Sequence, residues 1–375
     1  MCDGKRGQLP SMHLCELGGG GLFQSVDQLW SSPNPAPRCR RIALLAASAV
    51  AVLAAAGAGI GWLTHRHHND ASPAVTKPQT AIARIAATIP VGKRPEAIAV
   101  DSTTHTVYTA NYGDDTVSVV DTARRTVSTT IHVGHGPASV AVDPTSHIAV
   151  TANNRDDTAS VIDTTSHTVT ATVKLGTNPW GVAIDTNTRA AYVANQWDYS
   201  VSVINLDKHT VIATIPIGKN PYGVAVDPTT HTAYIANSSD GTLSVIDTGA
   251  LAVTATIPVG NDPRGVAIDA GNHSAYITNE AEGTASVINL DSQRVAVTIH
   301  IGNSPFGVAV DPDHHTAYTA NHDSALSVID TGTLAVGNTI RIGKNTFCVA
   351  VDPTSHTVYT ANQDNTVAVI EPGLP

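Results

Sequence analysis

From residue 81 onward, Val, Ile and Thr alternate with small or polar residues in short runs that are separated by turn-forming residues. A period of two is typical of half-buried β-strands. Residues 133–163 show the unit, in which ASVAVD, HIAVTAN and TASVID are the first three predicted strands and segments such as residues 168–174 supply the fourth. No part of this region has helical periodicity. The pattern therefore predicts an all-β domain.

The same unit recurs seven times. Its Y-x-A-N tetrapeptide ends at an asparagine that returns every 42 residues, with a last step of 41: Asn111, Asn153, Asn195, Asn237, Asn279, Asn321 and Asn362. Four strands in about 40–45 residues are typical of a β-propeller blade. A straight solenoid is the competing repeat fold.

The two ends of the repeat region complement one another. The last copy stops after its third strand, and residues 83–92 (ARIAATIPVG) look like a fourth strand with no blade of its own. Pairing them closes the ring without exposed strand edges. We therefore expect a seven-bladed β-propeller of four-stranded blades over residues 81–375, closed by the N-terminal strand.

The unit I-x-V-G-x-x-P-x-G-V-A-V-D-P-x-x-H-x-x-Y-x-A-N-x-x-x-x-T-x-S-V-I-D resembles the YVTN-type β-propeller repeat of surface-layer proteins and of bacterial periplasmic propellers of the YncE type. The resemblance covers residues 83–371. It implies the propeller fold and a class that includes surface and adhesion proteins. Similar propellers are lactone hydrolases, streptogramin lyases or cofactor-dependent dehydrogenases, so the resemblance does not decide the function.

A different segment precedes the repeats. Residues 42–63 are 22 residues without a charge, which suffice to span a bilayer of about 30 Å, and Arg38, Arg40 and Arg41 come directly before them. We expect a single transmembrane helix with a disordered cytoplasmic tail (1–41), a linker (64–80) and an extracytoplasmic propeller. The alternative is an export signal, cleaved near Ala58, and a secreted protein.

Charge and cysteine content exclude some classes. Residues 81–375 contain 14 basic and 27 acidic residues, a net charge of −13, which argues against binding of polyanions through phosphate contacts. Four cysteines, of which only Cys348 lies in the repeats, do not make a disulfide scaffold. The chain has no C-x-x-C-H motif for covalent haem.

Comparison of the seven internal copies distinguishes structural residues from candidate site residues. A residue that is present in every blade is explained by its role in the blade structure. One such set is a turn histidine: His105, His147, His231, His273, His315 and His356. We expect these histidines to be spread around one rim, too far apart to share an ion, and we predict no metal site. Another set is an acidic loop residue: Asp114, Asp156, Asp198, Asp240, Glu282, Asp323 and Asp364. It is interpreted as structural, with a calcium role as the alternative.

Residues that differ between blades are the candidate site. The position after the loop proline is Glu96, Ala138, Trp180, Tyr222, Arg264, Phe306 and Phe347, and the second loops add Tyr112, Trp197 and Tyr199. These positions hold every Trp and Phe of the repeats and every Tyr outside Y-x-A-N, whereas core rings would scatter over the strands. All except Ala138 are predicted to bind a ligand at the mouth of the central channel. The alternative is aromatic packing between blades.

The sequence thus favours a binding or interaction module for a small molecule, glycan or protein, without cofactor or catalytic residues, in a monomeric propeller. An enzyme such as a lactonase-like hydrolase or lyase is the alternative; its acid–base candidates, Glu96, His135, Glu280 and His322, have no diagnostic spacing. The third hypothesis is single-stranded nucleic-acid binding by base stacking. It would use a local basic patch of Lys93, Arg94, Lys219, Arg264 and Lys344.

Overall fold

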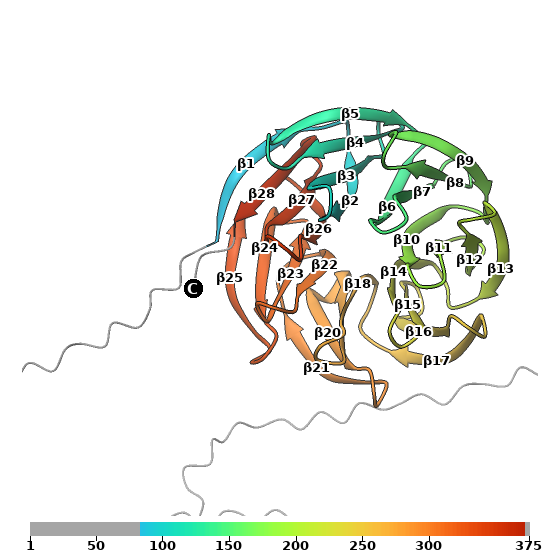
Figure 1. Ribbon diagram of the computed structural model, residues 1–375. Coiled ribbons are helices and arrows are strands. Elements are labelled where there is room, and N and C mark those ends of the chain that lie inside the picture. The colour runs from blue at the N-terminus through green and yellow to red at the C-terminus, as the bar shows by residue number, and fades with distance from the viewer. Residues whose placement is uncertain (1–82, 372–375) are drawn as a thin grey trace, which may run out of the picture. The chain divides into compact units, whose positions relative to one another are not determined.

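The computed structural model describes residues 83–371, which form seven four-stranded antiparallel β-sheets arranged in a ring (Figure 1). In six sheets the strands follow chain order from the channel outward, as in β2-β3-β4-β5. The seventh has the order β26-β27-β28-β1. The predicted all-β seven-bladed propeller is confirmed.

Each blade contributes one strand to each of four concentric positions. The innermost strands are β2 (Pro95–Asp101), β6 (Pro137–Asp143), β10 (Pro179–Asp185), β14 (Pro221–Asp227), β18 (Pro263–Asp269), β22 (Pro305–Asp311) and β26 (Thr346–Val351). The second strands are β3 (Thr106–Asn111), β7 (Ile148–Asn153), β11 (Ala190–Asn195), β15 (Thr232–Asn237), β19 (Ser274–Asn279), β23 (Thr316–Asn321) and β27 (Val358–Asn362).

The outer half of each blade is equally regular. The third strands are β4 (Thr116–Asp121), β8 (Thr158–Asp163), β12 (Ser200–Asn205), β16 (Thr242–Asp247), β20 (Thr284–Asn289), β24 (Ala325–Asp330) and β28 (Thr366–Glu371). The outermost strands are β5 (Thr126–His132), β9 (Thr168–Lys174), β13 (Thr210–Pro216), β17 (Ala252–Pro258), β21 (Arg294–His300), β25 (Ala335–Arg341) and β1 (Arg84–Pro90). A 3-10 turn, η2 (Glu280–Glu282), follows β19.

The hydrophobic core lies between neighbouring sheets. Tyr108 and Val119 of the first blade pack with Val140 and Ile162 of the second, and all four side chains are buried. The middle strands are buried on both faces, whereas the outermost strands alternate exposed and partly buried residues. The period-two pattern of the sequence therefore matches strands whose solvent exposure increases away from the channel.

The repeated polar residues hold the loops of each blade. Asn111 donates hydrogen bonds from Nδ2 to Thr116 Oγ1 (3.0 Å) and Ser118 Oγ (2.9 Å), and the equivalent asparagines make similar bonds. Asp114 accepts a hydrogen bond from the backbone N–H of Lys93 at 2.7 Å, which joins the two loops at the mouth. These contacts account for the repetition of both residues without a ligand.

The N-terminal strand closes the ring as predicted. β1 pairs antiparallel with β28, and Ile89, opposite Val367, is buried. Beside this pairing, Glu371 accepts hydrogen bonds from Arg84 (3.1 Å) and from Arg125 of the first blade (2.8 Å). The closing strand is therefore tied to both blades that it joins.

The predicted tail (1–41), membrane helix or signal (42–63) and linker (64–80) lie outside the described residues. Within residues 83–371, no helix has the length and apolar character needed to cross a membrane.

Candidate binding site at the channel mouth

A β-bulge at the start of each innermost strand directs one side chain toward the channel. In the third blade Pro179 pairs with Asn195, but pairing resumes only at Val182 with Val193, one residue out of register. Trp180 lies in this interruption. A bulge bends its strand and redirects a side chain. The residue at this position therefore leaves the sheet pattern in every blade.

The next residue sets how closely neighbouring blades approach. A Cβ atom at Gly181 would lie 2.1 Å from the carbonyl oxygen of Tyr222, and one at Gly223 would lie 2.1 Å from that of Arg264. Glycine is thus required by the backbone of the next blade. Blades one, two and seven carry a side chain at this position, namely Ala97, Ser139 and Cys348, and each of these residues is paired with the second strand.

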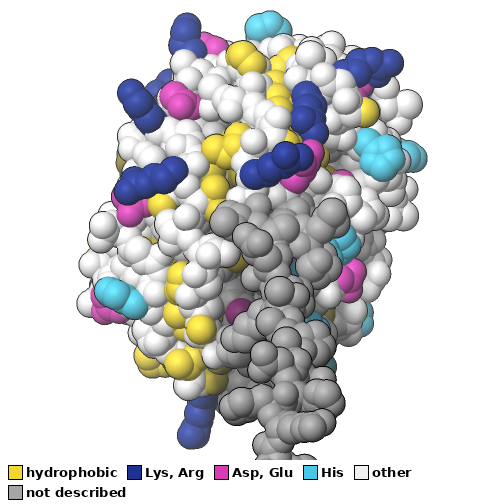
Figure 2. Space-filling model, turned by 90° about the vertical axis from the view of Figure 1, so that its left-hand side faces the viewer, with side chains coloured by type: hydrophobic (Ala, Val, Ile, Leu, Met, Phe, Trp, Pro, Cys, Tyr) yellow, Lys and Arg dark blue, Asp and Glu magenta, His cyan; other side chains and the backbone are white. Residues whose placement is uncertain are grey.

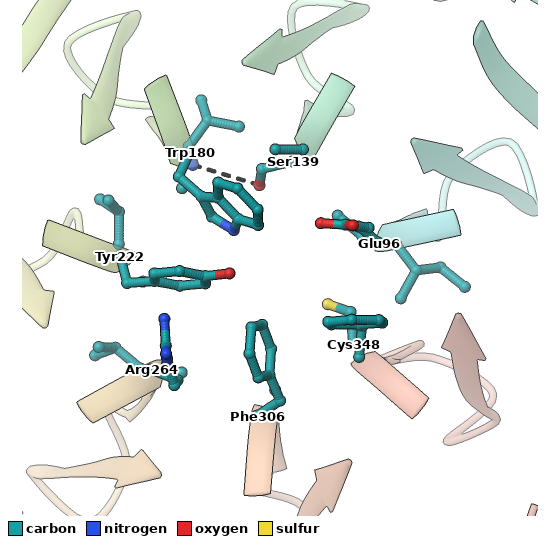
Figure 3. A pocket seen from close by; sticks show the side chains of 18 of the residues that line it. Glu96, Ser139, Trp180, Tyr222, Arg264, Phe306 and Cys348 are labelled. Atoms are coloured by element: carbon teal, nitrogen blue, oxygen red, sulfur yellow. Dashed lines mark hydrogen bonds between the residues drawn. The ribbon is translucent and has the colours of Figure 1, made fainter. Parts of the chain in front are cut away.

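The innermost strands surround a cavity of about 200 Å³, to which all seven blades contribute (Figure 3). Six of the predicted ligand-binding residues line it: Glu96, Trp180, Tyr222, Arg264, Phe306 and Phe347. Ala138, Ser139 and Cys348 complete the wall where these larger side chains are absent. The structure thus has these six positions converging on one concavity, as predicted.

Four aromatic rings form an arc around this cavity. The ring centroids of Trp180 and Tyr222 are 4.8 Å apart, those of Tyr222 and Phe306 are 5.2 Å apart, and those of Phe306 and Phe347 are 5.0 Å apart. The last two pairs are edge-to-face, the arrangement that the ring quadrupoles favour. Tyr222 and Phe347 are buried, whereas Trp180 and Phe306 are half-buried. The rings thus pack on one another between blades and also line the cavity.

Glu96 faces the arc from the first blade (Figure 3). Its side chain is 2% exposed, and neither carboxylate oxygen accepts a hydrogen bond, although Arg94 Nε lies 2.7 Å from Oε1. Burial raises the pKa of Glu96 to about 7, against the opposing effect of the Arg94 charge. The cavity therefore contains a carboxyl group that titrates near neutrality and has room for a hydrogen-bond donor.

Arg264 occupies the aromatic position of the fifth blade and is neutralised by its neighbours. Its guanidinium contacts Glu280 Oε2 at 2.6 Å and Asp262 Oδ2 at 2.9 Å. It also lies 4.4 Å from the centroid of the Tyr222 ring, within the range of cation–π attraction. Arg264 is therefore held in place by ion pairing and stacking, and it supports the ring of Tyr222.

The remaining predicted aromatics lie outside the cavity. Tyr112 is buried and does not line the cavity, and the guanidinium groups of Arg94 and Arg155 each lie 4.5 Å from its ring centroid. Trp197 is 69% exposed and Tyr199 is 46% exposed, and neither lines the cavity. Sequence reasoning placed them at the mouth because they share a loop with the site, but that loop carries them away from the channel.

The acid–base candidates divide between the mouth and the surface. His322 stacks on Phe306 with a centroid separation of 4.9 Å, and its Nε2 atom is buried without a hydrogen-bond partner. Burial lowers the pKa of His322, which favours the neutral imidazole. Glu280 is held by Arg264. His135 is exposed on the loop and bonds to Asp115, which raises the pKa of this histidine.

Sequence reasoning missed the polar lining atoms of Ser139 and Cys348. Ser139 Oγ accepts a hydrogen bond of 3.4 Å from the backbone N–H of Val182, and the half-buried thiol of Cys348 faces the cavity (Figure 3). Within the described residues Cys348 has no disulfide partner. The available signal was their departure from glycine in a repeated column.

Comparisons with known proteins identify the fold alone. No protein-family profile matches the chain, so membership of the YVTN-type repeat family stays an expectation. No curated protein sequence matches either. Among solved structures, a chain of Kuenenia stuttgartiensis hydrazine synthase is similar, with a TM-score of 0.67 and 18% sequence identity, over 76% of this chain and 97% of that chain. The described residues thus form a seven-bladed β-propeller, and the similarity extends to the fold alone.

Proposed function

We propose that this propeller is a binding module whose channel mouth holds a small organic amine. The ammonium group would bind Glu96, and the apolar part of the ligand would lie against the aromatic arc. The observation that carries the proposal is the carboxyl group of Glu96, which is buried in the cavity, lies 2.7 Å from Arg94 Nε and yet accepts no hydrogen bond of good geometry. A buried carboxylate with unsatisfied oxygens is unfavourable even beside a cation, and a bound N–H donor would reduce that penalty.

The aromatic arc supports a cationic ligand. The faces of aromatic rings carry negative potential and attract ammonium groups within about 6 Å of the centroid. The protein uses this attraction itself, since Arg264 stacks on Tyr222 and Arg94 stacks on Tyr112. Trp180 and Phe306 remain half-buried and line the cavity, so they have surface left for a ligand.

Cavity size and charge favour a small ligand over a polymer. A volume of about 200 Å³ is below the range of roughly 300–1,000 Å³ that is usual for drug-sized ligands. Three of the five basic residues proposed for nucleic acid are paired with carboxylates: Lys93 with Asp114, Arg94 with Glu96, and Arg264 with Asp262 and Glu280. On the side of the ring shown in Figure 2, basic and acidic side chains are likewise interspersed.

Calorimetric titration with matched probes tests the proposal. We expect 2-phenylethylammonium to bind, and its neutral isostere 2-phenylethanol to bind at least tenfold more weakly, since a hydrogen bond to a charged group contributes about 1.5–3 kcal/mol. Glu96→Gln should remove the difference, whereas Glu282→Gln, an exposed acid outside the cavity lining, should retain it. Equal affinity for ammonium and alcohol, or an unchanged preference in Glu96→Gln, would contradict the proposal.

Acid–base catalysis in the same mouth is the second candidate, because the pKa of Glu96, about 7, suits a general base at neutral pH. A lactonase-like hydrolase would turn over γ-lactones with a rate that rises through pH 7 and is lost in Glu96→Gln. If none of a panel of lactones is turned over and the amine binds, catalysis is excluded and the binding function is retained.

We also propose that the propeller is extracytoplasmic and is anchored by residues 42–63. The support is the uncharged 22-residue segment preceded by three arginines. Fractionation of expressing cells should place the full-length chain in the membrane, with the propeller accessible to added protease. A soluble chain beginning near residue 59 would indicate the cleaved export signal instead.

A further inference from the structure

A second cluster of chemically active side chains lies at the opposite end of the innermost strands from the mouth. Asp311 ends β22, five residues after Phe306, which corresponds to about 16 Å along an extended strand. His314 is in the turn that follows, and His356 is in the equivalent turn of the seventh blade. This cluster is therefore separate from the aromatic cavity and joins two blades.

The three side chains converge on one carboxylate. His314 Nδ1 lies 3.1 Å from Asp311 Oδ2, and His356 Nδ1 lies 3.0 Å from the same oxygen and 3.2 Å from Oδ1. The ring centroids of the two histidines are 3.9 Å apart. One ligand atom from each residue lies within 4.8 Å of the others. The Asp311 side chain is 1% exposed, whereas His314 is open to solvent.

This cluster is a departure from the repeat. Elsewhere the fourth residue of the turn is Thr, Ser or Asn, as at Thr230, Asn272 and Ser355, and it hydrogen bonds to the aspartate of its own turn. In the sixth blade the equivalent residue is His314, and the histidine of the next blade contacts the same carboxylate. His314 thus makes with an imidazole the contact that a hydroxyl or amide makes in other blades, and the contact from His356 is additional to the repeated pattern.

We propose that Asp311, His314 and His356 bind a divalent transition-metal ion, with Zn²⁺ as the expected occupant. Two imidazoles and a carboxylate are a frequent ligand set for Zn²⁺, and imidazole also suits Cu²⁺ and Ni²⁺. Ligand bonds of about 2.0–2.1 Å in a tetrahedron place ligand atoms about 3.3 Å apart. The observed separations of 3.0 and 3.1 Å are close to that edge, so small side-chain movements would admit the ion.

The surrounding contacts suit such a site. The backbone N–H of His314 donates to Asp311 Oδ1 at 3.3 Å, which orients the carboxylate in the manner of an outer-shell partner. Solvent access at His314 leaves a fourth coordination position for water. The set of repeated histidines did not predict this site, because only His356 belongs to that set and the second imidazole comes from His314.

A metal ion here would link the sixth blade to the seventh, whose fourth strand, β1, comes from the other end of the described chain. The ligands come from two blades and separate when the propeller unfolds, so an ion that binds only the folded state stabilises it by mass action. The site is thus proposed to act as a clip between the sixth and seventh blades.

The test uses the full-length chain with His65, His67 and His68 replaced by Ser, so that these imidazoles outside the repeats do not contribute to the measured binding. Zn²⁺ is titrated calorimetrically, and Co²⁺ binding is followed by its visible absorption. The informative variant is His314→Thr, which restores the residue of blades one, three and four and so preserves the turn. His356→Asn is the second variant, since Asn tolerates the positive φ of 58°. The matched control is His315→Asn, the neighbouring histidine with a φ of 49°.

We expect one equivalent of Zn²⁺ in the parent chain and in His315→Asn, with at least tenfold weaker binding in His314→Thr and His356→Asn. Zn²⁺ should raise the melting temperature of the parent chain and of His315→Asn, but not that of the other two variants. With Co²⁺, the parent chain and His315→Asn should show the intense absorption bands of tetrahedral coordination. Millimolar or weaker binding by the parent chain would overturn the proposal. Equal Zn²⁺ affinity of His314→Thr and the parent chain would also overturn it. Cooperative melting of each variant is the evidence that the variant is folded.

Discussion

Glu96 Oε1 lies 2.7 Å from Arg94 Nε, yet the carboxylate receives no hydrogen bond. The two charges attract one another, but the N–H bond is not directed at the oxygen, and the carboxyl group has lost its hydration. Desolvation is the larger effect and raises the pKa of Glu96 to about 7. A buried carboxyl group that accepts no hydrogen bond lowers the stability of the folded state, but it can accept a hydrogen bond from a ligand.

The first prediction concerns stability and pH. The pKa of Glu96 is about 7 in the folded protein and 4.5 as its ordinary value, so the folded state binds more protons between these pH values. The contribution of Glu96 to the free energy of unfolding, up to about 3 kcal/mol, is fully present below pH 4.5. This contribution is lost as the pH rises through 7. Urea unfolding at pH 5 and pH 8 should show this loss in the parent and much less of it in Glu96→Gln. A parallel decrease in both chains would contradict the assignment.

The second prediction separates ligand contact from core packing in the aromatic arc. Trp180 is half-buried beside the cavity, so Trp180→Ala should destabilise by clearly less than the ~3–5 kcal/mol of a fully buried aromatic side chain. Tyr192→Ala, at a fully buried ring of the same blade, provides that comparison. Trp180→Ala should also weaken 2-phenylethylammonium binding by about 0.5–2 kcal/mol. Equal losses of melting temperature in the two variants would show that Trp180 is chiefly a packing residue.

The third prediction concerns closure of the ring by β1. A chain beginning at Lys93 lacks the strand that covers β28, so it exposes unpaired backbone groups and the buried face around Ile89. It should aggregate or lose cooperative melting, whereas a chain beginning at Thr80 should melt cooperatively. Calorimetry of the two chains decides the point, and equal melting temperatures would exclude this role for β1.

The fourth prediction concerns the close approach of neighbouring blades. Gly181→Ala places a Cβ atom 2.1 Å from the carbonyl oxygen of Tyr222, so the innermost strands must separate, and we expect a destabilisation of several kcal/mol. Gly337→Ala is the matched control, because its Cβ would meet only Val328 O at 3.9 Å in an exposed part of β25. The control should be neutral or slightly stabilising. Denaturant unfolding measures both; a tolerated Gly181→Ala would refute the packing argument.

The fifth prediction concerns the thiol of Cys348. Burial raises its pKa, which lowers the fraction of reactive thiolate at neutral pH. A chain in which Cys2, Cys15 and Cys39 are replaced by Ser should therefore react with a thiol reagent much more slowly when native than in urea. Bound 2-phenylethylammonium should slow the native reaction further, because the thiol lines the same cavity. Native labelling at the rate of a free peptide thiol would contradict this prediction.

The order of strands, the number of blades and the closing role of β1 were predictable because each depends on local and repeated information. Strand alternation is a property of a few adjacent residues. The spacing of Asn111 and its counterparts repeats one hydrogen-bonded loop, in which the asparagine bonds to residues five and seven positions later. The convergence of Trp180, Tyr222, Phe306 and Phe347 followed from the same repetition, since equivalent positions in a ring face a common axis.

Relationships between blades were decided only by the tertiary structure. Trp197 shares a loop with the site and a residue type with Trp180, yet solvent rather than the cavity surrounds it. The burial of Glu96, and with it the raised pKa, depends on rings contributed by distant parts of the chain. His356 reaches the carboxylate of Asp311, 45 residues away, only because the sixth and seventh blades are adjacent. Local pattern thus determined which residues repeat and which vary, whereas side-chain environment, which arises from long-range packing, determined what the variable residues can bind.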